Sequence, residues 1–344
     1  MIDFRLVENR RELLIRYAVW QLRRSDVDTA IPVMNYIFDR NEFNIEQKYW
    51  FCFLYGNTYD VASALVLWSE MPDLHLVTPE KLNKLSENCA NNKIHYQNDV
   101  KWAKRHLFSI VQPYISNMTK AGGSHNYFKN ICCSNDPIEN YFKLRNEIFT
   151  HFYKFGRYVA FFYMQALKSC CGLNIDAPEM HLGNNCASPT DGLLYALGRE
   201  KEASRLYVED GRKTIKQSTN WSKEVIKGLN KEAESIIEEV NNRFSDIRLD
   251  YFLFETILCS YKKLFRRKNG RYLGYYLSRL NEDVSKAEKY WKGVDFNIVR
   301  DWMKETYPDC DYVTDKKPDN LRMQKFLDTG TLPELNMYLD LQNF

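Results

Sequence analysis

Apolar residues recur every three or four positions along much of this chain, and this period is the feature that most limits its fold. Between 138 and 169 the spacing is 3,4,3,4, over Phe152, Phe155, Val159, Phe162 and Ala166. Residues at this spacing lie on one face of an α-helix. The pattern predicts a helix over 138–169, and because its other faces are also apolar, we expect it to lie in the interior.

Similar periodicity predicts helices at 10–24, 92–109 and 219–245, and one or two more within 249–292. Asn44 is followed by Gln47, the arrangement of a capping box at a helix start. The run from Tyr49 to Tyr55 that follows is apolar all round and predicts a helix buried on every side that ends at Gly56. The chain is expected to restart a helix after Gly56, running to Trp68.

Turn-forming residues are scarce, with 14 Gly and 10 Pro in 344 residues. No stretch alternates polar and apolar residues over six positions, and strand and helix patterns do not alternate. The predicted fold class is therefore all-α: an irregular multi-helix globule with long ordered loops and little or no sheet. We expect one domain over 1–300, with a loop or insertion at 114–140, and a C-terminal extension over 301–344 packed on that domain.

Charge and cysteine content indicate which partners and which cellular compartment to expect for this chain. The net charge is only +3, from 48 basic and 45 acidic residues, so a nucleic-acid footprint has to be local. The nine cysteines show no paired zinc-ligand spacing and are expected to be reduced thiols. No signal peptide follows Met1, and the longest apolar run, 158–167, is too short to cross a bilayer. A cytoplasmic protein without a membrane partner is expected.

Four polar or aromatic residues share one face of the helix expected at 92–109. They follow a 4,3,4 spacing: His95, Asp99, Trp102 and His106. Three of them could ligate a metal ion. The alternative is a polar face on which Asp99 orients a histidine, and we favour it, so no metal site is predicted.

Arg157 follows Gly156 inside a segment with little polar surface. Arginine is rarely buried unless it is paired. Its partner is expected to be an anion, either an acidic side chain or a phosphate or carboxylate of a substrate.

A basic run lies between 262 and 272. It holds Lys262, Lys263, Arg266, Arg267, Lys268 and Arg271, with Tyr272 at its end and no acidic residue. Basic charge interleaved with aromatic rings favours a nucleic-acid contact. A solvated loop or helix end is the alternative.

Small polar residues at 182–192 precede an apolar helix. Such a helix start is a potential anion site, although Asp191 would act there as a cap or a base. No phosphate-cradling glycine loop, nucleophile elbow or zinc-enzyme motif is present.

Several segments together resemble the amino acid:DNA transferase family of bacteriophage DNA base hypermodification. They run in order over about 33–290: Gln47-Lys48-Tyr49-Trp50, Tyr55-Gly56-Asn57-Thr58-Tyr59, Trp68-Ser69-Glu70-Met71-Pro72-Asp73, Tyr96-Gln97-Asn98-Asp99-Val100-Lys101-Trp102 with Lys104 and His106, Phe155-Gly156-Arg157-Tyr158, Gly192-Leu193-Leu194-Tyr195-Ala196-Leu197-Gly198 and Gly270-Arg271-Tyr272-Leu273-Gly274-Tyr275-Tyr276. The segment at 114–140 and the tail are not covered.

The resemblance implies an all-helical, phage-encoded enzyme that acts on DNA. Such enzymes join an amine, typically of an amino acid, to the C5 methylene of pyrophosphorylated 5-hydroxymethyluracil, and pyrophosphate leaves. The resemblance does not specify the amine. No cofactor is required, although Mg²⁺ could assist the departure of pyrophosphate.

This chemistry suggests roles for the candidate residues. The group expected to bind substrate and leaving pyrophosphate is Arg157, Lys101, Lys104 and Glu70, with Trp68, Tyr96 and Tyr158 stacking the base. The attacking amine has to be neutral, so one base is needed, and the candidates are Asp99, His106 and Asp191.

Two positions depart from the family pattern. Thr190 and Asp191 replace an Arg-Asn pair, and His95 replaces an arginine. If that missing arginine binds pyrophosphate in the family, this chain uses another cation or another substrate. Alternative functions are a pyrophosphorylase or kinase of the same pathway, a helical DNA-binding protein, and a metal-dependent hydrolase.

Overall fold

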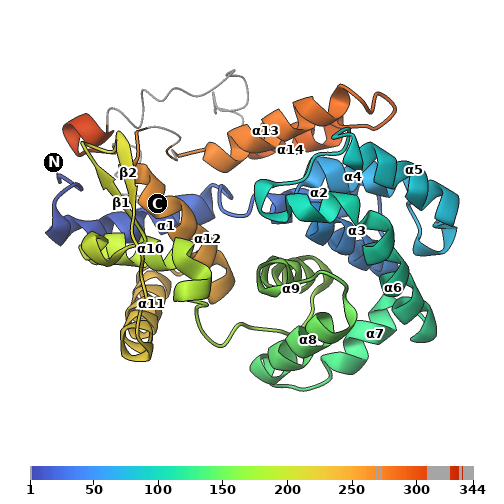
Figure 1. The fold of residues 1–344 in the computed structure, drawn as a ribbon, viewed down its shortest axis with the longest axis horizontal. Coiled ribbons are helices and arrows are strands. Elements are labelled where there is room, and N and C mark those ends of the chain that lie inside the picture. The colour runs from blue at the N-terminus through green and yellow to red at the C-terminus, as the bar shows by residue number, and fades with distance from the viewer. Residues whose placement is uncertain (1, 268–269, 271–272, 308–325, 333–334, 336–344) are drawn as a thin grey trace. The chain divides into compact units, whose positions relative to one another are not determined.

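The computed structural model describes residues 2–267, 270, 273–307, 326–332 and 335, and within them helices dominate (Figure 1). The predicted all-α class is confirmed. The strands in this part of the chain are β1 (Arg205–Val208) and β2 (Lys213–Lys216), an antiparallel pair in which Leu206 faces Ile215. None of the described helices is both long and apolar enough to span a bilayer. The cysteines in the described part are free thiols.

The chain forms two compact units. The first comprises Met1–Asp28, Glu179–Ser278 and Thr314–Phe344, and the second comprises Thr29–Pro178 and Arg279–Val313. The expected division into one domain over 1–300 and an extension over 301–344 stays a prediction.

In the first unit, α1 packs against α10, α11 and α12, around a core that includes Tyr17, Leu193 and Tyr261. Its helices are α1 (Arg10–Arg23), α10 (Ala187–Ala196), α11 (Lys223–Arg243) and α12 (Tyr251–Tyr261), with short 3-10 turns at Val7–Asn9, Asn184–Cys186, Glu200–Glu202 and Lys262–Phe265. The helices predicted at 10–24 and 219–245 are confirmed.

The second unit is arranged around α3 (Ile45–Thr58), which contacts α4, α7 and α9. Its other helices are α2 (Ala30–Arg40), α4 (Val61–Glu70), α5 (Pro79–Ala90), α6 (Leu107–Lys120), α7 (Ser124–Ile131), α8 (Pro137–His151), α9 (Arg157–Cys171) and α14 (Asn297–Thr306), with 3-10 turns at Leu74–Leu76 and Asn98–Arg105. Helix α13 (Tyr275–Glu288) contains the boundary between the two units.

The capping box at the start of α3 is confirmed. The Gln47 amide N–H donates to Asn44 Oδ1 at 3.0 Å, and the Asn44 amide N–H donates to Gln47 Oε1 at 2.9 Å. The residues from Tyr49 to Tyr55 are all buried, as predicted. The helix does not end at Gly56 but continues to Thr58, where Tyr59 takes a left-handed conformation with φ 50°.

The single helix predicted over 138–169 is wrong, because α8 ends at His151 and α9 begins at Arg157. Lys154 has φ 66°, and Gly156 is extended and caps α9. The apolar period continues across the break because Phe152 and Phe155 both pack in the same aromatic core, with their ring centroids 5.6 Å apart.

Two further expectations are wrong. Residues 92–109 do not form one α-helix, since 98–105 is a 3-10 turn and α6 begins at Leu107. Residues 114–140 are not a loop. They hold the end of α6, all of α7 and the start of α8, and Tyr114, Met118 and Phe128 are buried. Gly122 and Gly123 lie between α6 and α7, whereas Asn117, Asn126 and Asn140 lie within the helices.

Candidate functional site

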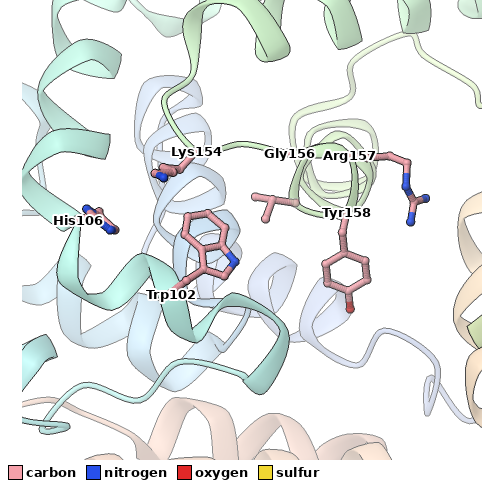
Figure 2. A pocket seen from close by; sticks show the side chains of 7 residues that line it. Trp102, His106, Lys154, Gly156, Arg157 and Tyr158 are labelled. Carbon is pink, nitrogen blue, oxygen red and sulfur yellow. The ribbon is translucent and has the colours of Figure 1, made fainter. Parts of the chain in front are cut away.

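A pocket in the second unit gathers candidate residues from separate segments. Its volume is about 310 Å³, within the range of small-molecule sites. Its walls come from the 3-10 turn η3 (Asn98–Arg105) and the start of α6, from the link before α9, and from the first turn of α9: Trp102, His106, Lys154, Gly156, Arg157, Tyr158 and Val159 (Figure 2). The structure thus brings together the predicted residues His106, Arg157 and Tyr158.

The start of α9 gives this pocket a positive electrostatic character. Arg157 is the first residue of a 15-residue helix whose start has no side-chain cap. The amide N–H groups of a first helical turn and the helix dipole attract anions. Lys154 adds a second cation, and none of the described residues that line the pocket is acidic.

The pocket also has aromatic walls. Figure 2 shows Trp102 and Lys154 to one side of the α9 start and Arg157 to the other, with Tyr158 between them in this view. Trp102 is 41% exposed, so its ring is open to a ligand. Tyr158 is held edge-on against Tyr59 at 5.9 Å and Phe162 at 5.2 Å between ring centroids. An aromatic ligand with an anionic group fits these walls.

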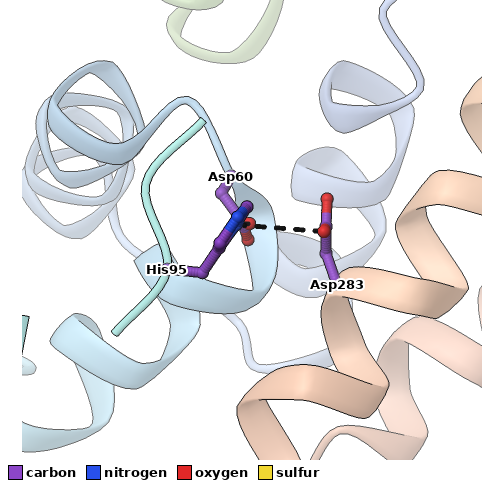
Figure 3. Close-up of side chains that lie close together, drawn as sticks. All are labelled: Asp60, His95 and Asp283. Carbon is purple, nitrogen blue, oxygen red and sulfur yellow. Dashed lines mark hydrogen bonds and ion pairs between the residues drawn. The ribbon is translucent and has the colours of Figure 1, made fainter. Parts of the chain in front are cut away.

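His95 does not join this pocket but forms a cluster with two aspartates of the same unit (Figure 3). His95 Nδ1 lies 2.7 Å from Asp60 Oδ2 and 3.8 Å from Asp283 Oδ1. Asp60 also caps α4, accepting the Ser63 amide N–H at 2.9 Å. His95 precedes the 3-10 turn at Asn98–Arg105 and pairs with Asp60, so it is not on the same helix face as His106.

These three side chains offer ligand atoms within 4.8 Å of one another, a donor set that a divalent cation accepts. Cationic side chains already meet Asp283, however: Lys286 Nζ lies 3.1 Å from its Oδ1, and Arg279 Nε lies 3.5 Å from its Oδ2. Lys286 is shared between Asp283 and Glu282, whose Oε1 also lies 3.1 Å from its Nζ. The cluster is best described as an ion network that joins α13 to the start of α4.

Asp191 and Lys262 pair with each other in the first unit. Their side chains are fully buried, with Lys262 Nζ 3.0 Å from Asp191 Oδ2, and Asp191 also accepts the Ser204 amide N–H and hydroxyl. Burial lowers the pKa of the Lys262 ammonium, and Asp191 opposes that shift. Lys262 is thus turned away from any phosphate, and we leave both residues out of the proposed site.

The rest of the basic run is only partly described. Lys263 and Arg266 are half-buried, and Arg267 forms ion pairs with Asp210 and Asp328. Lys268, Arg271 and Tyr272 lie outside the described residues. A role for this run in DNA binding stays a prediction.

Three candidate binding residues have other surroundings. Tyr96 is buried, 3.6 Å from the Cys89 thiol, and burial raises the pKa of its hydroxyl well above the usual range. Trp68 packs on Phe43 with ring centroids 4.5 Å apart. Glu70 ends α4 and is half-buried. None of the three lines the pocket.

Two candidate lysines lie on η3 beside Trp102. Lys101 is exposed, and the Lys104 ammonium donates to Asn92 Oδ1 at 2.7 Å. The side chain of Asp99 lies outside what the structure describes. Lys154 was missed from the sequence, because it lies in the break inside what looked like one continuous helix.

An all-helical unit with a cationic, aromatic-walled pocket at a helix start defines a protein suited to bind a nucleotide-like ligand. The chain belongs to the amino acid:DNA transferase family, whose model matches residues 26–270. It is therefore a transferase, an enzyme that acts on DNA with an amino acid as donor. All pocket residues fall inside the matched range.

A curated relative points to the same class. The chain is 24% identical over 304 residues to a serinyltransferase of Salmonella phage ViI, an alignment that covers 84% of this chain and 72% of the relative. The family match and this relative together show that the chain is an enzyme and not only a DNA-binding protein.

Proposed function

We propose that this enzyme joins an amino acid to the C5 methylene of pyrophosphorylated 5-hydroxymethyluracil in DNA and releases pyrophosphate. The observation that carries the proposal is the pocket at the start of α9, where Arg157 and Lys154 flank an uncapped helix start beside two aromatic rings. The relative named a serinyltransferase makes serine the first donor to test.

In this reaction the bond between the methylene carbon and the pyrophosphate oxygen breaks, and the amine nitrogen forms a bond to that carbon. Pyrophosphate leaves with the bonding electron pair. The amide N–H groups at the start of α9, together with Arg157 and Lys154, stabilise the charge that develops on it.

The amine has to lose a proton. Of the candidate bases whose side chains the structure describes, His106 lines the pocket, and its ring lies 6.3 Å from that of Tyr153. A histidine can accept a proton near neutral pH. We therefore assign the general base to His106.

The reacting base is reached by flipping it out of the duplex, since the pocket has to enclose the methylene and the leaving group. In this proposal the flipped ring contacts Trp102 and Tyr158, which both line the pocket. No resident cofactor is proposed, because cationic side chains and a helix start already face the leaving group. Mg²⁺ would enter with pyrophosphate as its counterion. The proposed setting is the cytoplasm of a phage-infected cell, where the DNA substrate is found.

Mass spectrometry of nucleosides tests the reaction. The full chain is incubated with DNA that carries pyrophosphorylated 5-hydroxymethyluracil and with a pool of amino acids and polyamines. We expect a thymidine linked through its methylene to serine or another amine. DNA with unphosphorylated 5-hydroxymethyluracil is the control and should give no product. Product from that control, or none from either DNA, would overturn the proposal.

A further inference from the structure

Helix α8 carries an unusual row of exposed apolar side chains. Ile138, Phe142 and Phe149 are 41%, 50% and 43% exposed, and Tyr153, just beyond the helix, is 44% exposed. A contiguous set of large apolar residues on a surface marks an interaction site, whereas isolated ones need no explanation.

The row lies along one side of the helix. Ile138, Phe142, Arg145 and Phe149 follow a 4,3,4 spacing, which places them on one face. The Arg145 guanidinium lies over the Phe149 ring, 4.9 Å from its centroid. We call Ile138, Phe142, Arg145, Phe149 and Tyr153 the α8 stripe.

The stripe leads to the pocket. The Tyr153 ring lies 6.3 Å from the His106 ring, and the Lys154 ammonium lies 5.5 Å from the Tyr153 ring centroid. His106 and Lys154 both line the pocket. Tyr153, two residues beyond the end of α8, therefore contacts two residues of the candidate site, within the same unit.

The charge of this surface favours an anionic partner. The stripe contains Arg145 and no acidic residue, and the pocket adds Lys154 and Arg157. The same helix carries Glu139, whose carboxylate lies 2.6 Å from Lys143 Nζ, and Glu147, which accepts a hydrogen bond from the Tyr127 hydroxyl and lies 3.7 Å from His151 Nε2. A protein or a second copy of this chain would cover the apolar rings, but it would not account for the cation of the stripe and for the contact of Tyr153 with the cationic pocket.

We propose that the α8 stripe binds the DNA strand that flanks the reacting base, with bases stacked on Phe142, Phe149 and Tyr153 and a phosphate on Arg145. Aromatic rings interleaved with arginine bind unstacked bases with little sequence preference. The 15 residues of α8 rise about 22 Å, the length of roughly six nucleotides of a B-form strand. This inference rests on the proposed function, since it needs a DNA strand at the pocket.

Fluorescence anisotropy with labelled, unmodified oligonucleotides, single-stranded and duplex, tests the stripe. The double variant Phe142→Ala/Phe149→Ala should weaken binding about 25-fold, from about fivefold for each stacked ring. Tyr290→Ala is the matched control, because Tyr290 is 58% exposed in the same unit. It should leave the Kd unchanged.

Arg145→Ala provides a second measurement. It should reduce the slope of log Kd against log salt by about 0.7–0.9, the value of one lost phosphate contact. Lys304→Ala, at a side chain that is 69% exposed, should not change the slope. On the modified substrate, the stripe variants should raise KM for DNA and keep kcat.

An unchanged Kd in the double variant would overturn the proposal that the α8 stripe binds DNA. So would a change confined to self-association in sedimentation, because that would assign the surface to a second copy. The proposed chemistry fails separately. If wild-type enzyme makes no product while DNA binding still depends on Phe142 and Phe149, the chemistry is wrong and the stripe stands.

Discussion

At the scale of single residues, the position of Arg157 matters more than its burial. The sequence placed it in the middle of a long helix, where an arginine needs a buried partner. The structure places it at the first position of α9, half-buried, on the wall of the pocket. The side chain and the helix dipole therefore act on the same space.

Arg157→Ala should lower kcat of the transfer by about 10²–10³-fold, the usual cost of removing one group that stabilises developing charge. Arg157→Lys should recover part of this loss, because it keeps the charge but not the planar fork. Arg40→Ala is the control, since Arg40 is 57% exposed and pairs with Glu305. Rates are measured by product mass spectrometry. Full turnover in Arg157→Ala would refute the assigned role.

The Asp283 carboxyl gives a second residue-scale prediction, on pH. Burial and the neighbouring Asp60 raise its pKa from 3.8 to about 6. Between about pH 4 and pH 6 the folded chain keeps this proton while the unfolded chain loses it. Its contribution to stability is therefore complete below pH 4 and is lost as the pH rises through 6.

Asp283→Asn resembles the protonated form and should remove this pH dependence. The free energy of unfolding of the variant relative to wild type should rise by about 2–3 kcal/mol between pH 4 and pH 7. Urea denaturation at several pH values measures it. Asp301→Asn, at a side chain that is 52% exposed, is the control and should follow wild type. Parallel curves for Asp283→Asn and wild type would contradict the assignment.

At the scale of elements, α10 and α12 approach each other closely because of Gly192. A Cβ added to Gly192 would lie 2.1 Å from the backbone oxygen of Leu258, which no side-chain rotation can relieve. The sequence showed a glycine inside an apolar segment, but only the neighbouring helix explains it.

Gly192→Ala should destabilise the protein by at least about 2 kcal/mol, because the two helices have to separate. Gly228→Ala is the matched control. Gly228 lies within α11 with no atom within 4 Å of the added carbon, so alanine there should stabilise by about 0.5–1 kcal/mol. Chemical denaturation measures both, and a neutral Gly192→Ala would show that α10 and α12 can shift apart at no cost.

At the scale of the whole molecule, the low net charge limits how DNA is held. With a charge of +3, affinity has to come from few cations, such as Arg145, Lys154 and Arg157. About three phosphate contacts predict a slope of log affinity against log salt of roughly −3 for duplex DNA. Anisotropy titrations over a range of KCl concentrations measure it, and a slope steeper than about −7 would indicate a much wider basic face.

The sequence determined the helical class, the family and the helices at 10–24 and 219–245. These follow from side-chain spacing within one segment, which local geometry translates directly into a helix face. Arg157, Tyr158 and His106 were also selected from the sequence as candidate site residues. An arginine, a tyrosine and a histidine are residue types that can bind an anion, stack on a base and accept a proton, and residue type is known before the fold is.

Only the tertiary structure decided which residues meet. His95 pairs with Asp60 rather than with its neighbours on the chain, and Asp191 is neutralised by Lys262, 71 positions away. The break before α9 exposes Lys154. Because the spacing of apolar residues continues across this break, the spacing does not reveal it. Pairing and burial depend on segments far apart along the chain, and a pattern of local spacing carries no information about them.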